Sequence, residues 1–145
     1  MGIDGKPGAS LRAFRDYLPM TSIFGADIDR RVLFEEERIK TYFVDQTDVA
    51  SFNELSIRLK ETKFDLMIDD GLHNSWANLN SLGFFLKHIK DEGIMLIEDI
   101  KQEDLAYYKV LSQLRKDLKF VWMEFNILYT LIIARKEVRL EKIFD

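Results

Sequence analysis

Phe64-Asp65-Leu66-Met67-Ile68-Asp69-Asp70-Gly71-Leu72-His73 is an apolar run that ends in two carboxylates, a glycine and a histidine. A short apolar run closed by turn residues predicts a strand of a parallel sheet that is covered on both faces. Ligands of such sheets bind outside the carboxyl ends of the strands. We therefore expect Asp69, Asp70 and His73 to lie at a binding site.

The same pattern recurs downstream, where the apolar run 93–97 stops at Glu98 and Asp99. Neighbouring parallel strands would bring these acids and those after the first run to one edge of the sheet. Crowded carboxylates repel one another unless a cation lies among them. The two runs together indicate a metal site. A solvated turn at 98–99 is the alternative.

Bulk composition narrows the class of protein. The chain has 145 residues, of which 47% are hydrophobic and 32% charged, as in one soluble globular domain. Its net charge of -4 disfavours nucleic acid and anionic membrane surfaces as partners. It has no cysteine, which excludes thiolate zinc sites and cysteine nucleophiles and fits a reducing cytoplasm. No apolar run approaches the roughly 20 residues of a membrane span, so we expect a cytoplasmic protein without a membrane partner.

A glycine-rich loop, residues 2–10, opens a predicted helix over 10–18 with Ser10 as its N-cap. Such loops let backbone N–H groups approach a nucleotide-like cofactor, although a plain turn or flexible terminus is the alternative. The strand predicted over 22–29 carries Asp27, 22 residues after Gly5. That spacing is close to the roughly 20-residue offset at which an acid binds ribose hydroxyls in dinucleotide folds.

The remaining pattern alternates strands with helices. Strands are predicted over 38–44, 64–69, 94–98, 120–125 and 127–134, and helices over 49–59, 74–88 and 104–118. The alternation predicts an α/β fold, a Rossmann-like three-layer sandwich with a mostly parallel sheet. The last two strands are joined so tightly at Asn126 that they must form an antiparallel hairpin. Asp48 is expected to cap a helix, Trp76 to lie in the core, and His88 to lie on a helix surface.

Five motifs carry a resemblance to a known family. They are Gly-Ala-Ser-Leu-Arg at 8–12, Gly-Ala-Asp-Ile-Asp at 25–29, Asp-Gln-Thr-Asp at 45–48, Ile-Asp-Asp-Gly-Leu-His at 68–73 and Ile-Glu-Asp at 97–99. The order and spacing of the last two are fairly specific for this family, whereas the glycine loop alone is not. The chain resembles class I S-adenosylmethionine (SAM)-dependent methyltransferases. In particular, it is similar to the metal-dependent sugar O-methyltransferases of the macrocin and mycinamicin type, with rhamnosyl O-methyltransferases and cephalosporin hydroxylases among the relatives. The resemblance implies a methyltransferase domain over 1–136 and leaves a charged tail over 137–145.

The resemblance also implies site residues. The SAM site would comprise Gly2, Gly5 and Ser10 at the methionine part, Asp27 at the ribose, Asp45 and Gln46 beside the adenine, and Asp69 on the cofactor side. Magnesium would be held by Asp70, Glu98 and Asp99, with His73 as the base. The metal would acidify a sugar hydroxyl, whose proton an imidazole can accept. The structural alternatives for His73 are that it caps the next helix or that it bonds to a backbone carbonyl.

The family's first strand is complete and central, whereas this sequence begins inside it. We therefore expect the neighbouring strands to have partly unpaired inner edges and SAM to bind more weakly than in full-length relatives. Two hypotheses remain. One is a SAM- and Mg²⁺-dependent O-methyltransferase that acts on a sugar hydroxyl of a glycan or glycosylated small molecule. The other is a non-catalytic fragment or assembly module that forms homo-oligomers through the exposed sheet edge.

Overall fold

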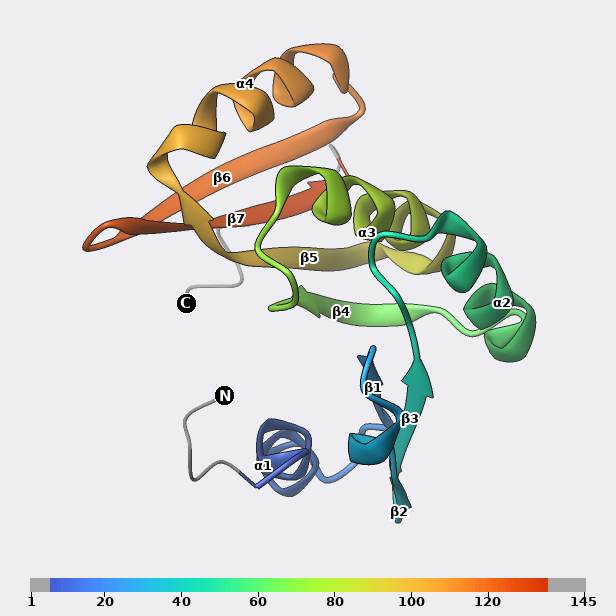
Figure 1. Ribbon diagram of the computed structural model, residues 1–145. Coiled ribbons are helices and arrows are strands. Elements are labelled where there is room, and N and C mark those ends of the chain that lie inside the picture. Colours follow the sequence, from blue (N-terminus) through green and yellow to red (C-terminus); the bar gives the residue numbers. More distant parts are fainter. Residues whose placement is uncertain (1–5, 136–145) are drawn as a thin grey trace. The chain divides into compact units, whose positions relative to one another are not determined.

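The computed structural model describes residues 6–135 of the chain (Figure 1). By its internal contacts the chain divides into two compact units, Met1–Arg58 and Leu59–Asp145. The prediction of one domain over 1–136 stays a prediction, and the charged tail over 137–145 lies outside the described residues.

The first unit is a small sheet with one helix against it. Its elements are α1 (Ala9–Tyr17), β1 (Ile23–Asp27), the 3-10 helix η1 (Arg30–Val32), β2 (Glu35–Glu36), β3 (Ile39–Phe43) and α2 (Val49–Leu59) apart from its last residue. Strand β3 is central, with β1 parallel to it and β2 antiparallel. Helix α1 packs on β1 at Gly25, where a Cβ atom would lie 2.5 Å from Leu11 Cδ1, so this close approach requires glycine.

Helix α1 begins and ends one residue earlier than predicted, at Ala9 and Tyr17. Gly8 is the N-cap with φ of 76°, a left-handed conformation that glycine adopts without strain, and no side chain caps the helix. The prediction that Ser10 is the cap is wrong, because Ser10 lies inside the helix and is exposed. After the helix, the Arg38 guanidinium donates to the carbonyl oxygens of Arg15 and Leu18 at 3.0 Å each. These bonds satisfy carbonyl groups that the helix end leaves unpaired.

The second unit is a four-stranded sheet with two helices. Its elements are β4 (Phe64–Asp69), α3 (Ser75–His88), β5 (Ile89–Lys101), the 3-10 helix η2 (Gln102–Asp104), α4 (Leu105–Leu114), β6 (Leu118–Phe125) and β7 (Leu128–Arg135). The strand order is β4-β5-β7-β6, with β4 and β5 parallel and β7 antiparallel to both neighbours (Figure 1). The predicted closing hairpin is confirmed, and its last strand, β7, lies between β5 and β6.

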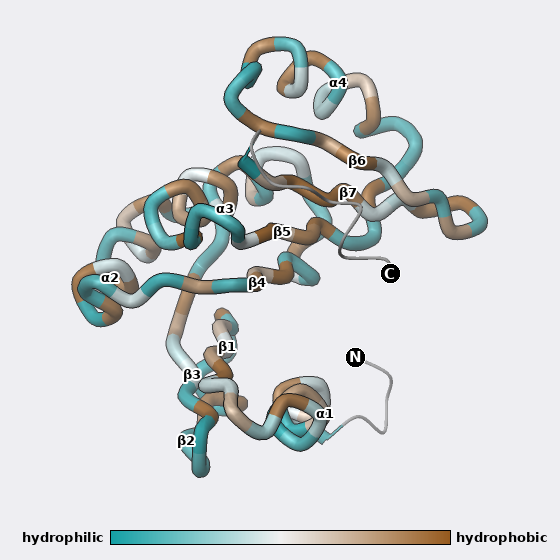
Figure 2. Tube along the Cα trace, turned by 180° about the vertical axis from the view of Figure 1, so that it is seen from behind, coloured by the Kyte–Doolittle hydropathy of each residue, from teal (hydrophilic) through white to brown (hydrophobic). Residues whose placement is uncertain are grey.

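The core of the second unit lies between the sheet and its helices. Its main cluster comprises Leu82, Phe85, Ile89, Met95, Ile97, Ile100, Tyr108, Leu118, Leu131 and Ile133. Figure 2 shows the corresponding apolar segments along β5 and β7. Helix α3 contacts β4 and β5, and α4 contacts β6. None of the helices in residues 6–135 combines the length and hydropathy that crossing a bilayer demands.

Two predictions for α3 are wrong. Trp76 is 65% exposed, whereas His88 is 5% exposed, with Nδ1 3.1 Å from the Thr62 carbonyl oxygen and its ring stacked on Phe84. The buried positions include Ala77, Ser81, Phe84 and His88, which repeat every three to four residues. The inward face of this helix therefore contains small and polar residues that a hydropathy pattern assigns to solvent.

Strands β1 and β4 each pair on one side only among the described strands. Strand β1 pairs with β3, and β4 pairs with β5. On β4, Leu66 and Ile68 are 40% and 38% exposed. The described strands form two separate sheets, because none of them pairs with the second edge of β1 or of β4. The predicted α/β fold class is confirmed.

Candidate functional site

The second unit gathers acidic residues at the carboxyl ends of β4 and β5. Asp69, the last residue of β4, is in register with Ile97 of the parallel strand β5, so Asp70 follows β4 at the level where Glu98 continues β5. One ligand atom each from Asp70, His73 and Asp99 lies within 4.8 Å of the others. The structure thus brings together Asp70, His73 and Asp99, whereas Glu98 does not belong to this group of ligand atoms.

A bulge in β5 gives Asp99 its position. Ile97 pairs with Leu131 and Ile100 with Tyr129, so β5 has one residue more than β7 between these pairs. Asp99 lies in this bulge with φ of 53°. Successive residues of a regular strand point to opposite faces, and a bulge re-aims a side chain that would otherwise point away. The bulge explains how a ligand atom of Asp99 lies within 4.8 Å of those of Asp70 and His73, while the preceding Glu98 is affected by the charges of both acids.

His73 is held in an unfavourable backbone conformation. Its φ is 50°, in the left-handed region that side chains other than glycine rarely adopt. Its Nε2 lies 3.7 Å from Asp70 Oδ1. Its Nδ1 is buried and has no hydrogen-bond partner within residues 6–135. Strained conformations of this kind persist where the surrounding structure enforces them, and they concentrate at functional sites.

The acids of the cluster repel one another, and no lysine or arginine side chain of the described ion pairs neutralises them. Burial raises the pKa of the Glu98 carboxyl, and the charges of Asp70 and Asp99 raise it further, while His73 opposes the shift. Among the described ion pairs, none joins Glu98, Asp70 or Asp99 to a lysine or arginine. Three oxygen-donor side chains beside one imidazole fit a hard divalent cation such as Mg²⁺.

The first unit also has acids at its strand ends. Asp27 ends β1, and its Oδ1 accepts a hydrogen bond from the backbone N–H of Asp29 at 2.8 Å. Asp45 follows β3, and its Oδ1 accepts from the backbone N–H and the hydroxyl of Thr47 at 2.8 and 2.7 Å. The hydroxyl bond, followed by the backbone bond, lowers the pKa of Asp45. Gln46 is half-buried next to it.

The other residues of the predicted SAM site have different positions. Gly2 and Gly5 lie outside the described residues. Ser10 is exposed on α1, in the first unit. Asp69 belongs to the second unit, is 7% exposed, and accepts a hydrogen bond from Asn78. The assignment of these residues to the cofactor stays a prediction.

Sequence reasoning missed two buried polar residues next to the acidic cluster. Asn78 and Tyr108 are 3% and 2% exposed and bond to each other and, through Asn78, to Asp69. Asn78 could have been noticed in the sequence because it lies between Ala77 and Leu82, on a face of the predicted helix whose other residues are mostly apolar or small. The sequence pattern assigned no role to Tyr108.

No family model matches the chain. In sequence, it is 34% identical over 93 residues to demethylmacrocin O-methyltransferase of Streptomyces fradiae. It is 32% identical over 93 residues to mycinamicin VI 2''-O-methyltransferase of Micromonospora griseorubida. Each match covers 64% of this chain and 23% of the relative, so the chain spans about a quarter of the length of these relatives.

Solved structures of methyltransferases resemble the described fold. The MycE methyltransferase from the mycinamycin biosynthetic pathway, in complex with Mg, S-adenosylhomocysteine (SAH) and mycinamycin VI, superposes with a TM-score of 0.67 at 22% identity, covering 90% of this chain and 41% of that chain. A putative ribosomal RNA methyltransferase from Plasmodium falciparum gives a TM-score of 0.65 at 11% identity, covering 89% of this chain and 80% of that chain. Since enzymes with different acceptors match about equally well, these likenesses show the fold. The resemblance drawn from the motifs is confirmed: the chain is similar in sequence to the macrocin and mycinamicin sugar O-methyltransferases and has the fold of SAM-dependent methyltransferases.

Proposed function

We propose that the chain carries the metal centre and part of the cofactor site of a SAM- and Mg²⁺-dependent O-methyltransferase that methylates a sugar hydroxyl of a glycan or glycosylated small molecule. The observation that carries the proposal is the cluster of Asp70, His73 and Asp99, with Glu98 electrostatically coupled to it. Sequence similarity to two sugar-pathway O-methyltransferases supports the same chemistry.

The side chains of the cluster fit separate roles. Mg²⁺ prefers oxygen ligands in octahedral geometry and keeps several waters, so Asp70, Glu98 and Asp99 are suited to hold it. When bound there, the ion would supply Lewis acidity that lowers the pKa of a coordinated hydroxyl. His73 is less suited as a ligand of this hard ion and remains available for proton transfer.

His73 would act as the general base. Its Nδ1 has no hydrogen-bond partner in the described part of the chain, and its Nε2 faces Asp70 at 3.7 Å. An imidazole is the side chain best suited to take up a proton near neutral pH. As the hydroxyl oxygen forms its bond to the methyl carbon and the sulfonium S–C bond breaks, His73 would take the hydroxyl proton.

In the first unit, Asp27 is suited to the ribose of SAM. Its Oδ1 is used by the turn at Asp29, and its Oδ2 has no partner among the described residues, so it can accept from a ribose hydroxyl. We assign Asp45 and Gln46 to the adenine and Gly2, Gly5 and Ser10 to the methionine part, as the motifs imply.

The lack of cysteine supports a reducing compartment, the cytoplasm.

Calorimetry and an activity assay test the proposal. MgCl₂ titrated into the purified chain should bind, and His73→Ala should retain that binding. With SAM and a macrolide that bears an unmethylated sugar, the wild-type chain should transfer a methyl group, detected by mass spectrometry, and His73→Ala should not. Asp65→Asn is a matched control, because Asp65 lies on β4 but pairs with Lys90 at 2.9 Å. Absence of Mg²⁺ binding at neutral pH would overturn the proposal.

A non-catalytic assembly module is the second candidate. It is favoured by the second edge of β4, which lacks a described strand partner and exposes Leu66 and Ile68. It predicts a stable homo-oligomer in light scattering and no Mg²⁺ binding. A monomer that binds Mg²⁺ favours the enzyme instead.

A further inference from the structure

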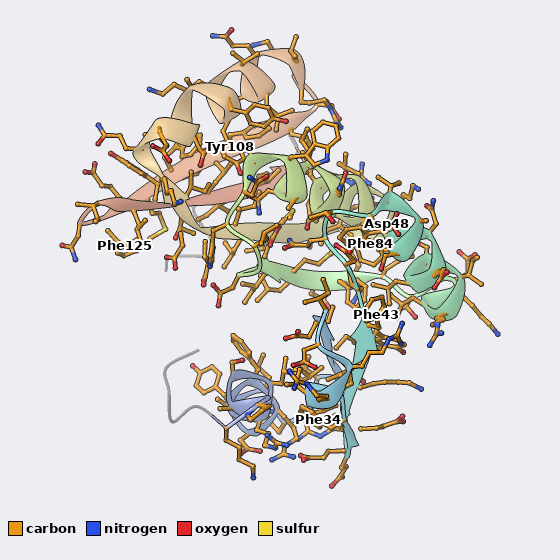
Figure 3. All side chains as sticks on the ribbon, in the orientation of Figure 1. Phe34, Phe43, Asp48, Phe84, Tyr108 and Phe125 are labelled. Carbon is orange, nitrogen blue, oxygen red and sulfur yellow. The ribbon has the colours of Figure 1, made fainter. Side chains whose placement is uncertain are left out.

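A chain of hydrogen bonds runs through the interior of the second unit, from α4 through α3 to the end of β4. The Tyr108 hydroxyl donates to Asn78 Oδ1 at 2.7 Å, and Asn78 Nδ2 donates to Asp69 Oδ2 at 2.8 Å. These side chains are 2%, 3% and 7% exposed. Tyr108 lies on the side of α4 that faces α3 (Figure 3). The network ends one residue before Asp70, the first acid of the candidate metal centre.

Burying the polar side chains of Tyr108, Asn78 and Asp69 costs free energy unless each of them forms hydrogen bonds. Burial raises the pKa of Tyr108, which keeps its hydroxyl protonated and able to donate. The side-chain oxygen of Asn78 accepts from the Tyr108 hydroxyl, and its amide nitrogen donates to Asp69 Oδ2. Apolar side chains of similar volume would serve packing alone at least as well. The network therefore points to a requirement beyond a filled core.

A second branch fixes the other end of the same loop. The Ser75 hydroxyl donates to Asp104 Oδ1 at 2.7 Å and also interacts with the Tyr108 hydroxyl. Ser75 is the first residue of α3, directly after the capping residue Asn74. Residues 70–74, which connect β4 to α3, are thus tied to the network both before and after the loop.

The two branches also join the two segments that bear the acids. Asp104 ends η2, which follows β5 and its bulge at Asp99. The Ser75–Asp104 bond therefore connects the loop of His73 to the segment of Asp99. His73 and Asp99 have φ of 50° and 53°, and such strained backbones need support from their surroundings.

We propose that Tyr108 and Asn78 are positioning residues that hold the loop of residues 70–74 ready for metal binding. They act through Asp69 and Ser75, which flank the loop. A loop that is already ordered loses little conformational entropy when a ligand binds. The inference rests on the proposed metal centre and adds residues that touch neither metal nor substrate.

Tyr108→Phe tests the role by removing one hydroxyl. At a temperature where the variant is fully folded, Mg²⁺ affinity by calorimetry should fall by about 10-fold, the lower end for residues that orient metal ligands. Tyr107→Phe is the matched control, since it removes the same group from the neighbouring ring, which is 37% exposed, and should leave affinity within about twofold. Ser75→Ala breaks the second branch with less disturbance of the core and should weaken binding by about threefold.

The histidine resonances give a second readout without metal. The chain has two histidines, His73 in the loop and His88 in the core, so their imidazole NMR signals can be assigned by substitution of His73. In metal-free protein, Tyr108→Phe should shift or broaden the His73 signals and leave those of His88 in place. A purely structural role would lower the melting temperature without changing His73 or the affinity of the folded protein, and that result would overturn the proposal. Absence of Mg²⁺ binding by the wild-type chain would refute the metal centre, whereas the NMR comparison would still decide the positioning role.

Discussion

Acidic side chains end strands in both units, but the two groups have opposite surroundings. In the first unit, Asp27 and Asp45 accept hydrogen bonds within their own turns. Hydrogen bonds from the side chain and the backbone of Arg31 lower the pKa of Asp29 to about 2. In the second unit, burial and the neighbouring charges raise the pKa of Glu98. Acids that follow strands are therefore satisfied in one sheet and mutually repelled in the other.

The difference separates a structural acid from a candidate ligand. An acid bonded to nearby N–H groups stabilises the turn that carries it and has less reason to need a cation. Acids held together against repulsion, with strained residues such as His73 and Asp99 among them, cost stability that a bound cation can return. Position after a strand alone does not identify a metal site.

The largest effect is expected from Asp99→Asn. It removes a negative charge and a carboxylate oxygen from the cluster. Mg²⁺ affinity measured by calorimetry should therefore fall by about 100-fold or more, at or above the largest loss seen when a residue that supports a metal ligand is changed. Asp65→Asn should bind Mg²⁺ as the wild type does. Unchanged affinity in Asp99→Asn would remove the distinction between the two groups of acids.

A smaller effect with a defined pH dependence is expected from Glu98→Gln. Because its pKa is raised in the folded state, ionised Glu98 costs stability above that pKa, and the cost disappears as the pH falls below the ordinary carboxyl range. Without metal, the variant should therefore melt about 2 °C higher than the wild type near neutral pH and show no gain near pH 3. Added Mg²⁺ should raise the melting temperature of the wild type more than that of the variant. A metal-free variant that melts lower at neutral pH would contradict the repulsion.

The smallest effect is expected from Asp27→Asn in the first unit. The amide oxygen can still accept from the backbone N–H of Asp29, so the melting temperature should stay within about 2 °C of the wild type. Mg²⁺ affinity should not change. Calorimetry that showed a large loss of Mg²⁺ binding in this variant would break the comparison, because an acid of the first unit would then contribute to the metal centre.

Much of the fold was predictable because local signals and global pairing agree. Helix α2 has the predicted bounds, Asp48 accepts from the backbone N–H of Ala50 at its start, and β4 spans the predicted residues. The meeting of Asp70 with Asp99 was also predictable, since the ends of neighbouring parallel strands share an edge.

Other features depend on packing that no single segment reveals. Strand β5 runs over Ile89–Lys101, well beyond the predicted 94–98, because pairing with β4 and β7 extends it past its apolar stretch. Trp76 is exposed and His88 is buried, the reverse of the prediction, because the orientation of α3 is set by the elements that it packs against. Gly93 shows the same dependence, since a Cβ there would lie 2.8 Å from the Phe64 carbonyl oxygen.

By itself, the sequence determined the order of strands and helices, the closing hairpin, and which acids follow which strands, because periodicity and turn residues act over a few neighbouring positions. Only the tertiary structure decided the bulge that aims Asp99, the left-handed backbone of His73, and the buried bonds among Asp69, Asn78 and Tyr108. These features arise from contacts between residues far apart in the chain, whose hydrogen bonds and charges gain their strength from a shared, water-poor interior.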